Sequence, residues 1–466
     1  EWQGMQGPLV YLKCAVTHKK RDQHGHLKHN QISEDESERF EAVAFSKHIR
    51  VILAESVDFC SHSCPAMKRL RYLAFFALLS AFPATSFAAS VNDPLFAQQW
   101  SLKQVNASEA WDVTMGDASV VVAVIDTGID TRNPDFKGSL WTNAYEVANN
   151  GIDDDNNGYI DDIHGWNFQT DSSDTLPMRV TGQSTEAYGH GTAVASIIAA
   201  RANDGFGMAG IAPKVRIMPL VVLDGDGFGS NQGLAEAIRY AAAKKARIIN
   251  ISVTGYEDAD EVRFALYEAQ QLGVLIVTAV GNSGDVNGED LTETPVYPAC
   301  NGKNDASGAM IRVTGTDTLD QRAPHANFGA DCTDIAAPGH ELLGAHPVDL
   351  PKGSTATTTP DHVSGLTGTS VASPMVAGTA ALIASVNPDL TASEIRNIIL
   401  TTTDVIEPRV MNGEKGRLGY GRLNAERAVK KAAGVQAAAP VVVKPVQPVN
   451  TQKAQWDAVF RFWFDR

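Results

Sequence analysis

The chain has 466 residues, of which 44% are hydrophobic, and its formal net charge is -15 at pH 7. A chain of this length buries a full hydrophobic core, so we expect one large domain with appendages rather than a minimal module. The acidic balance argues against a nucleic-acid-binding surface, because such surfaces are basic. It fits a soluble exported protein or a calcium binder, but by itself the acidity is explained by the simpler alternative that it only keeps the chain soluble.

Residues 67–88 have the pattern of a secretory signal peptide. A basic start at 67–71 precedes an apolar run at 72–82, and small residues follow at 86–88. This order of segments predicts cleavage after Ala88. The apolar run is shorter than the roughly 20 residues of a membrane-spanning helix, which disfavours the alternative of a permanent anchor.

Residues 1–66 precede the segment that a signal peptidase would read. We interpret them as upstream sequence translated from a misplaced start, outside the mature protein. Three of the five cysteines lie before residue 67, so the exported part keeps Cys300 and Cys332. These two either form one disulfide or remain as buried thiols.

Short apolar segments alternate with helical segments after residue 119. The expected strands are 120–125, 215–223, 247–253, 274–280 and 311–315, and the expected helices between them are 193–202, 234–245 and 260–272. Continuous apolar strands that alternate with helices predict an α/β fold: a three-layer, doubly wound, mainly parallel sheet. A later helix begins at Thr391, where Glu394 completes a capping box.

The composition changes near residue 431. Residues 431–450 are rich in Ala, Val and Pro, which is typical of an extended linker. Residues 451–466 form an aromatic tail, which either docks on a surface or begins a further domain. The main domain is therefore expected over 89–430.

Three polar side chains occupy positions at which parallel sheets place functional groups. Asp126 ends a buried strand, His190 lies between Gly189 and Gly191 at the head of a helix, and Ser370 lies in the first turn of an apolar helix. Each has a structural alternative: an Asp that caps a turn, a core histidine, or an N-cap serine. Only the three together distinguish catalysis from these alternatives.

The three motifs, in this order, resemble those of the subtilisin-like serine proteases, the subtilase family. They read VIDTGID at 124–130, YGHGTAVA at 188–195 and GTSVASPMVAG at 368–378. The resemblance covers about residues 92–429 and is greatest to thermitase-like members. An α/β-hydrolase is excluded, because its residues run Ser, acid, His and need a G-x-S-x-G motif.

The resemblance implies a secreted serine endopeptidase that forms an acyl-enzyme. Ser370 would be the nucleophile, His190 the general base and Asp126 the carboxylate that orients it. Asn282 matches the asparagine that stabilises the oxyanion. A non-catalytic, calcium-stabilised binding module on the same fold is the alternative, and an esterase or amidase would share the machinery.

The matching motifs also predict where a substrate binds. An extended peptide would add as a strand between two edges, Gly227-Phe228-Gly229 and Ser252-Val253-Thr254-Gly255. Val296 is expected at the base of the first specificity pocket, which would favour medium apolar side chains. The expected partners are protein or peptide substrates, with no nucleic acid, no membrane span in the mature form, and a monomeric state.

Calcium is the expected cofactor, on two signals. The loop at 153–162 carries alternate oxygen ligands and a glycine, as calcium loops do. Its candidate ligands are Asp153, Asp155, Asn157 and Asp161, and a solvated acidic turn is the alternative. The second signal is the family resemblance, which implies a site formed by Asp93, Asp135, Asp204 and the backbone carbonyls of Phe206 and Met208.

Overall fold

The computed structural model describes residues 91–178, 185–304, 307–349, 357–359, 361–406 and 414–434. All of them belong to one of the two units into which the chain divides, Ser86–Arg466. The segment 1–66, the signal peptide at 67–88, the tail at 451–466 and the linker beyond residue 434 lie outside the described residues. Those four interpretations therefore stay predictions.

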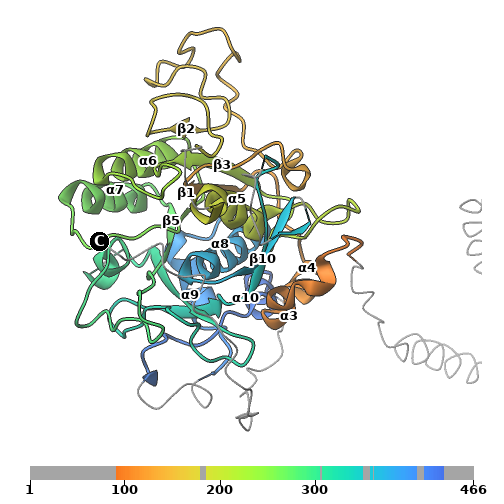
Figure 1. Ribbon diagram of the computed structural model, residues 1–466, viewed down its shortest axis with the longest axis vertical. Coiled ribbons are helices and arrows are strands. Elements are labelled where there is room, and N and C mark those ends of the chain that lie inside the picture. Colours follow the sequence, from red (N-terminus) through yellow and green to blue (C-terminus); the bar gives the residue numbers. More distant parts are fainter. Residues whose placement is uncertain are drawn as a thin grey trace, which may run out of the picture. The chain divides into compact units, whose positions relative to one another are not determined.

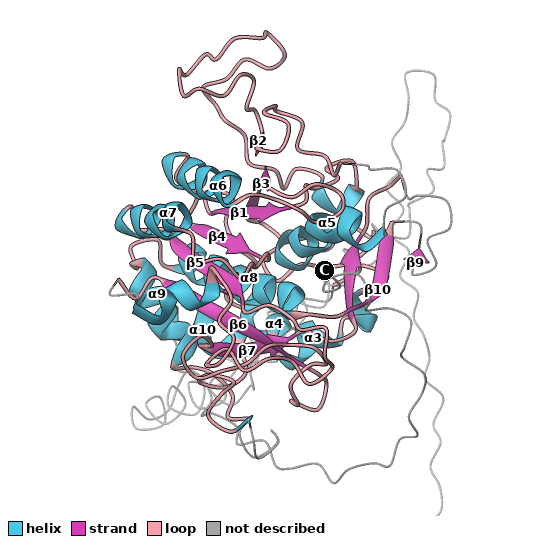
Figure 2. Ribbon diagram, turned by 60° about the vertical axis from the view of Figure 1, so that its left-hand side comes forward, coloured by secondary structure: helices cyan, strands magenta, loops and turns pink. Residues whose placement is uncertain are grey.

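A seven-stranded sheet forms the centre of the described unit, and all of its strand pairs are parallel. In spatial order its strands are β2 (Trp166–Asn167), β3 (Arg216–Val221), β1 (Val121–Asp126), β4 (Ile248–Ile251), β5 (Leu275–Ala279), β6 (Met310–Thr316) and β7 (Ile335–Pro338). Figure 2 shows these strands side by side with helices on either side. The predicted doubly wound parallel sheet is confirmed.

Helices cover both faces of the sheet (Figure 1). The longer ones are α5 (Thr185–Ala199), α6 (Asn231–Ala243), α7 (Asp260–Gln271), α8 (Thr369–Val386), α9 (Ala392–Leu400) and α10 (Ala425–Ala432). Short helical segments are α3 (Trp100–Gln104), α4 (Ala107–Trp111), η1 (Phe96–Gln98), η2 (Pro134–Phe136) and η3 (Ala299–Asn304). The capping box predicted at Thr391 is present at the start of α9.

Strand β1 explains how the two helical layers are separated. Val122 and Val124 pack in the cluster that contains α5 and α8, whereas Val121, Ala123 and Ile125 pack in the cluster that contains α6 and α7. Successive side chains of a strand point to opposite faces, so one apolar run supplies both cores. This is why the strand is continuously hydrophobic rather than alternating.

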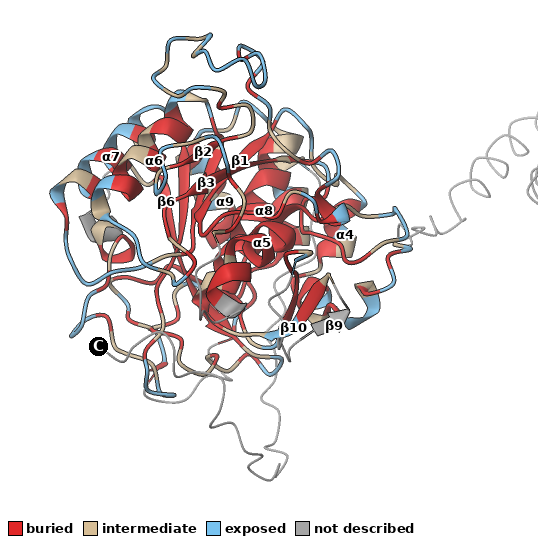
Figure 3. Cartoon of the chain, turned by 45° about the horizontal axis from the view of Figure 1, so that its top comes forward, coloured by how far each residue is buried: buried red, intermediate tan, exposed pale blue. Residues whose placement is uncertain are grey.

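Helix α8 crosses the core. It is the one helix among the described residues that is long and apolar enough to span a membrane, but most of it is buried within the protein. Figure 3 shows α8 and α5 buried along most of their length. Beside them lies a small antiparallel sheet in the order β8 (Leu342–Ala345), β10 (His362–Leu366), β9 (Thr357–Thr359).

The predicted start of one helix is wrong by eight residues, from 193 to 185, the largest difference among the predicted bounds. The helix expected at 193–202 is α5, which begins at Thr185, so His190 lies inside the helix rather than at its head. The glycines on both sides of His190 lower the intrinsic helix propensity of this segment, so the local sequence does not predict a helix there. Here packing outweighs propensity, because the helix is pressed against the end of β1.

Candidate active site

Asp126 is the last residue of β1, at the carboxyl end of the central sheet. Its side chain is fully buried, and its Oδ1 accepts a hydrogen bond from the N–H of Thr127 at 2.8 Å. Polar groups at this edge of a parallel sheet face the crevice in which ligands bind. The carboxylate is therefore held rigidly and away from water.

His190 faces this carboxylate from helix α5. Its Nδ1 lies 2.7 Å from Oδ1 of Asp126, and 16% of its side chain is exposed. Burial lowers the pKa of His190, but the charge and the hydrogen bond of Asp126 outweigh burial and hold that pKa above the ordinary 6.5. The contact also leaves Nε2 as the nitrogen that can exchange a proton with another group.

Gly191 explains how helix and strand come so close. A Cβ at this position would lie 2.4 Å from the carbonyl oxygen of Gly128 and 3.1 Å from Oδ1 of Asp126. No real side chain tolerates the first of these distances. The glycine beside His190 is therefore needed to bring the imidazole onto the carboxylate.

Ser370 is the second residue of α8, after the N-cap Gly368. In a regular helix its carbonyl would accept a hydrogen bond from residue 374, but Pro374 has no N–H. The hydroxyl of Ser252 donates to this carbonyl instead, at 2.8 Å. A side chain beyond β4 thus replaces the missing helical hydrogen bond and ties the backbone of Ser370 to the sheet.

Two further side chains complete this connection. The amide Nδ2 of Asn250 donates to the Ser252 hydroxyl at 2.9 Å, and the hydroxyl of Ser373 donates to Oδ1 of Asn250 at 2.8 Å. Asn250 and Ser373 are fully buried. The first turn of α8 is therefore joined to the end of β4 by a closed set of hydrogen bonds.

Asn282 lies on the other side of the same turn. Its Oδ1 accepts the backbone N–H of Thr369 at 2.9 Å. A Cβ built on Gly368 would lie 3.1 Å from Nδ2 of Asn282 and 3.4 Å from Oγ of Ser370, so these two atoms border one small space. Gly368 leaves that space open and has a φ of 146°, which other residues rarely adopt.

The two predicted substrate edges both lie on the surface. In the first, Phe228 is 73% exposed, its carbonyl accepts the N–H of Asp224, and Gly229 pairs with Leu223. In the second, Thr254 and Gly255 are exposed and Val253 is half-buried, whereas Ser252 is buried. Gly227 has a φ of 85°, which allows the turn that presents the first edge.

Val296 lies beneath the second edge. It is 3% exposed, and a Cβ on Gly281 would contact both it and Oγ1 of Thr254. Its neighbour Tyr297 exchanges two backbone hydrogen bonds of 2.8 Å with Gly255. The structure therefore brings Thr254, Gly281 and Val296 close together.

Cys300 and Cys332 are joined by a disulfide. Both are buried in a small apolar cluster that includes Val296 and Val280. Of the two alternatives that the sequence left open, the structure has the bridge. It attaches the segment that carries Val296 to the turn before β7.

The acidic loop at 153–162 is folded differently from a linear calcium loop. Both oxygens of Asp153 accept backbone N–H groups of the loop, from Asn157 and Gly158, and Asp161 accepts those of Asn150 and Gly151. Asp155 instead joins Glu146 and Asp162, with one carboxylate oxygen of each within 4.8 Å of the others. Within the described ranges this is the one such group of three possible metal ligands.

The second predicted calcium site is assembled only in part. Asp93 accepts the N–H groups of Asn203 and Asp204 at 2.9 and 3.2 Å, which ties the 203–208 loop to the start of the domain. Asp135 is fully buried, and its Oδ2 lies 2.6 Å from Nε2 of His362. Its Oδ1 is buried without a hydrogen-bond partner in the described part of the chain.

The environment of Asp135 disfavours its negative charge, so a cation bound beside it would stabilise this second site. Burial raises the pKa of Asp135 and the charge of Asp204 adds to the rise, against the opposing effects of His362 and the Met208 N–H. An orphaned, buried carboxylate oxygen is a ligand of the type that calcium takes. Gly207, which lies between Phe206 and Met208, is close to it, since a Cβ on this glycine would lie 2.5 Å from that oxygen.

Sequence reasoning missed two groups of residues. Glu146 lies outside the acidic motif, and no spacing rule connects it to that motif. The set of Asn250, Ser252 and Ser373 was missed as a support for Ser370, although Pro374 gave a signal: a proline four residues after a helical residue leaves a carbonyl without its partner.

Similar sequences and a similar structure are found among known proteases. The sequence model of the subtilase family matches residues 117–421. Thermitase from Thermoactinomyces vulgaris is 31% identical over 340 residues, which are 73% of this chain and 99% of that protein. The major intracellular serine protease of Bacillus subtilis is 32% identical over 286 residues, 61% of this chain and 74% of that protein. A solved protease structure from Pseudoalteromonas arctica is similar with a TM-score of 0.58 and 25% identity, over 74% of this chain and all of that one.

Proposed function

This chain belongs to the subtilase family of serine endopeptidases, and from that premise we propose that Ser370, His190 and Asp126 form its catalytic triad. The observation that carries the proposal is the 2.7 Å contact between Nδ1 of His190 and Oδ1 of Asp126. It joins two segments 64 residues apart at the carboxyl edge of the sheet. An imidazole held in this way accepts a proton on Nε2.

In the proposed reaction the Oγ of Ser370 attacks the carbonyl carbon of the scissile peptide bond. His190 takes the Ser370 proton as the new C–O bond forms, and returns it to the amine nitrogen as the C–N bond breaks. Asp126 stays ionised and stabilises the imidazolium. Water then repeats both steps on the acyl-enzyme, which releases the acid and restores Ser370.

The negative oxygen of the tetrahedral intermediate would be held by Nδ2 of Asn282 and the backbone N–H of Ser370. The orientation of the Asn282 amide supports this role. Its Oδ1 accepts the Thr369 N–H, so Nδ2 remains to donate. The positive end of α8 lies at the same place. The donors are thus set before charge develops, which is how such groups lower a barrier.

Substrates would bind as an added strand between Gly227-Phe228-Gly229 and Ser252-Val253-Thr254-Gly255. The exposed residues on these edges support the binding of an extended peptide by main-chain pairing, which ignores side-chain identity. We propose that Val296 forms the base of the first pocket and favours medium apolar side chains. Cleavage-site profiling dominated by Lys or Arg would overturn this preference.

We propose that the mature enzyme is a monomer exported by the signal peptide at 67–88, with its catalytic domain at 89–430. The odd cysteine total supports this division, since only Cys300 and Cys332 lie beyond the cleavage point. N-terminal sequencing of the exported protein should find a start near Ala89. A start beyond Trp100 would contradict this division.

We further propose that calcium stabilises the domain, at the acidic loop and at the Asp93, Asp135 and Asp204 site. Carboxylate oxygens buried without partners support both locations. Bound calcium would supply charge neutralisation there. Chelation should lower the melting temperature, and an unchanged melting temperature would exclude both sites.

The test of the function is labelling of the purified protein with a fluorophosphonate, followed by mapping of the modified peptide and a casein cleavage assay. We expect modification of Ser370 together with proteolysis, and neither in a Ser370→Ala control. No modification of folded, calcium-loaded protein would overturn the proposal and favour the binding-module alternative.

A further inference from the structure

We propose that the acidic loop holds a calcium ion between Glu146, Asp155 and Asp162, and that Lys244 competes with this ion for the same carboxylates. The inference rests on the proposed calcium stabilisation and replaces the linear ligand set of that loop with a tertiary one. Glu146 precedes the acidic motif and Lys244 ends helix α6, so only folding brings these residues together.

The first observation is that the three carboxylates lie close together and that their negative charge is not balanced. One oxygen each of Glu146, Asp155 and Asp162 lies within 4.8 Å of the others. Among the described residues Lys244 is the cation in contact, with Nζ 2.7 Å from Oδ2 of Asp155 and 3.1 Å from Oδ2 of Asp162. Three carboxylates against one ammonium leave an excess of negative charge, and buried negative charge needs a further cation.

The second observation is independent of the clustering. Glu146 is 9% exposed, and its Oε1 accepts the N–H groups of Asp154 and Asp155 at 3.0 and 3.1 Å. Its Oε2 is buried without a hydrogen-bond partner among the described residues, and so is Oδ1 of Asp155. Buried carboxylate oxygens are costly without a partner, so these two atoms indicate a ligand.

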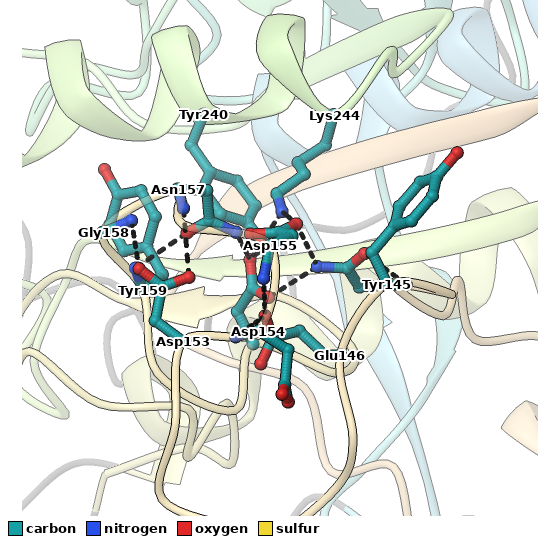
Figure 4. A network of polar contacts seen from close by, with 12 residues as sticks. Tyr145, Glu146, Asp153, Asp154, Asp155, Asn157, Gly158, Tyr159, Tyr240 and Lys244 are labelled. Carbon is teal, nitrogen blue, oxygen red and sulfur yellow. Dashed lines mark hydrogen bonds and ion pairs between the residues drawn. The ribbon is translucent and has the colours of Figure 1, made fainter.

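The surrounding contacts hold the carboxylates in place. The amide of Asn143 donates to Asp162 at 2.6 Å and to Asp155 at 3.1 Å, and the hydroxyl of Tyr240 donates to Asp162 at 2.6 Å. Figure 4 shows Tyr240 and Lys244 reaching from α6 toward Asp155 and the loop. Ligands fixed by second contacts bind metal more tightly than free ones.

The type of ligand atom in this group of carboxylates indicates which ion it binds. Oxygen is the one donor type offered, with no imidazole or thiolate in the group, which favours a hard cation with irregular coordination. Backbone carbonyls and water would complete its shell. The aromatic rings of Tyr159, Tyr240 and Trp166 pack against one another beside the group, and they provide a spectroscopic probe.

The test is terbium luminescence, excited through these rings, on the full chain carrying Ser370→Ala to prevent self-cleavage. We expect bound terbium to be displaced by calcium, and Glu146→Gln to weaken calcium at this site by at least about tenfold. Lys244→Gln should strengthen it, because a competing charge is removed. Asp154→Asn, an exposed carboxylate of the same loop, is the matched control and should change little.

The outcomes separate this inference from the wider proposal. If calcium binds and raises the melting temperature but Glu146→Gln leaves the luminescence titration unchanged, the tertiary site is wrong and calcium stabilisation stands. If Asp204→Asn removes the whole signal, the ion lies in the other site and the inference fails. If no calcium binds at all, both fail, and Lys244 is the cation of this cluster.

Discussion

At the scale of single residues, the charge of Asp126 decides how His190 behaves. The imidazole is mostly buried, which by itself lowers its pKa, yet the carboxylate 2.7 Å away raises it above 6.5. A general base works only when it is deprotonated, so activity must increase as pH rises through this pKa. In the proposed mechanism the same pair therefore sets both the orientation of the base and the pH at which it acts.

Asp126→Asn should separate these two effects. We expect kcat to fall by about 10⁴-fold, because the neutral amide neither stabilises the imidazolium nor selects the correct tautomer. The acid limb of the profile of kcat/KM against pH should move to lower pH, since burial then acts on His190 without opposition. A variant that keeps the wild-type midpoint would show that another group controls the pH dependence.

Asn282→Ala tests the oxyanion site. We expect kcat to fall by roughly 10²- to 10³-fold with KM little changed, a magnitude measured in subtilisin, a member of the same family. The amide acts on charge that appears only in the transition state. Steady-state kinetics on a peptide substrate measures the two constants, and a variant with full turnover would remove Asn282 from the mechanism.

At the scale of elements, helix α8, which carries the proposed nucleophile Ser370, lacks one of its own hydrogen bonds. Pro374 removes one N–H from the first turns of α8, and a side chain from the end of β4 supplies the replacement. The same β4 edge is proposed to pair with substrate. The hydroxyl of Ser252, together with the hydrogen bond from Ser373 to Asn250, thus connects helix, strand and substrate edge.

Ser252→Ala should expose this connection. Leaving the partly buried Ser370 carbonyl without a partner should lower the free energy of unfolding by about 1–3 kcal/mol. The rate of fluorophosphonate labelling of Ser370 should fall as well, and Ser252→Thr should restore it.

Ser385→Ala serves as the control for this variant. It removes a hydroxyl from the far end of α8, where Ser385 donates to the carbonyl of Ala381. Its labelling rate should stay at the wild-type value. If Ser252→Ala also labels at the wild-type rate, the hydrogen bond stabilises the fold without positioning the nucleophile.

At the scale of the whole molecule, distant segments are held together by covalent and ionic links. The disulfide closes 32 residues of sequence separation around the predicted specificity pocket. On the far edge of the sheet, Asp334 pairs with Arg312 and Arg396, each at 2.8 Å, and these neighbours hold the pKa of Asp334 below its ordinary value despite burial. The disulfide and these ion pairs restrict the motion of segments that the hydrogen bonds between strands do not hold.

Reduction of Cys300–Cys332 should lower the free energy of unfolding by roughly 3–4 kcal/mol, from the chain entropy of the loop that it closes. Thermal unfolding with and without reductant measures this, and intact mass should rise by two hydrogens. The double variant Cys300→Ala with Cys332→Ala should reproduce the effect. A protein whose stability and mass ignore reductant would lack the bridge.

The sequence by itself determined the sheet, the family and the three polar residues at its edge. Strand periodicity and local motifs are short-range signals, and Asp126, His190 and Ser370 each lie in a motif that can be read without neighbours. Only the tertiary structure decided the start of α5, the support of Ser370 by Ser252, the cysteine bridge, and the grouping of Glu146 with Asp155 and Asp162. These depend on distances between segments far apart in the chain, which packing sets and spacing along the sequence does not record.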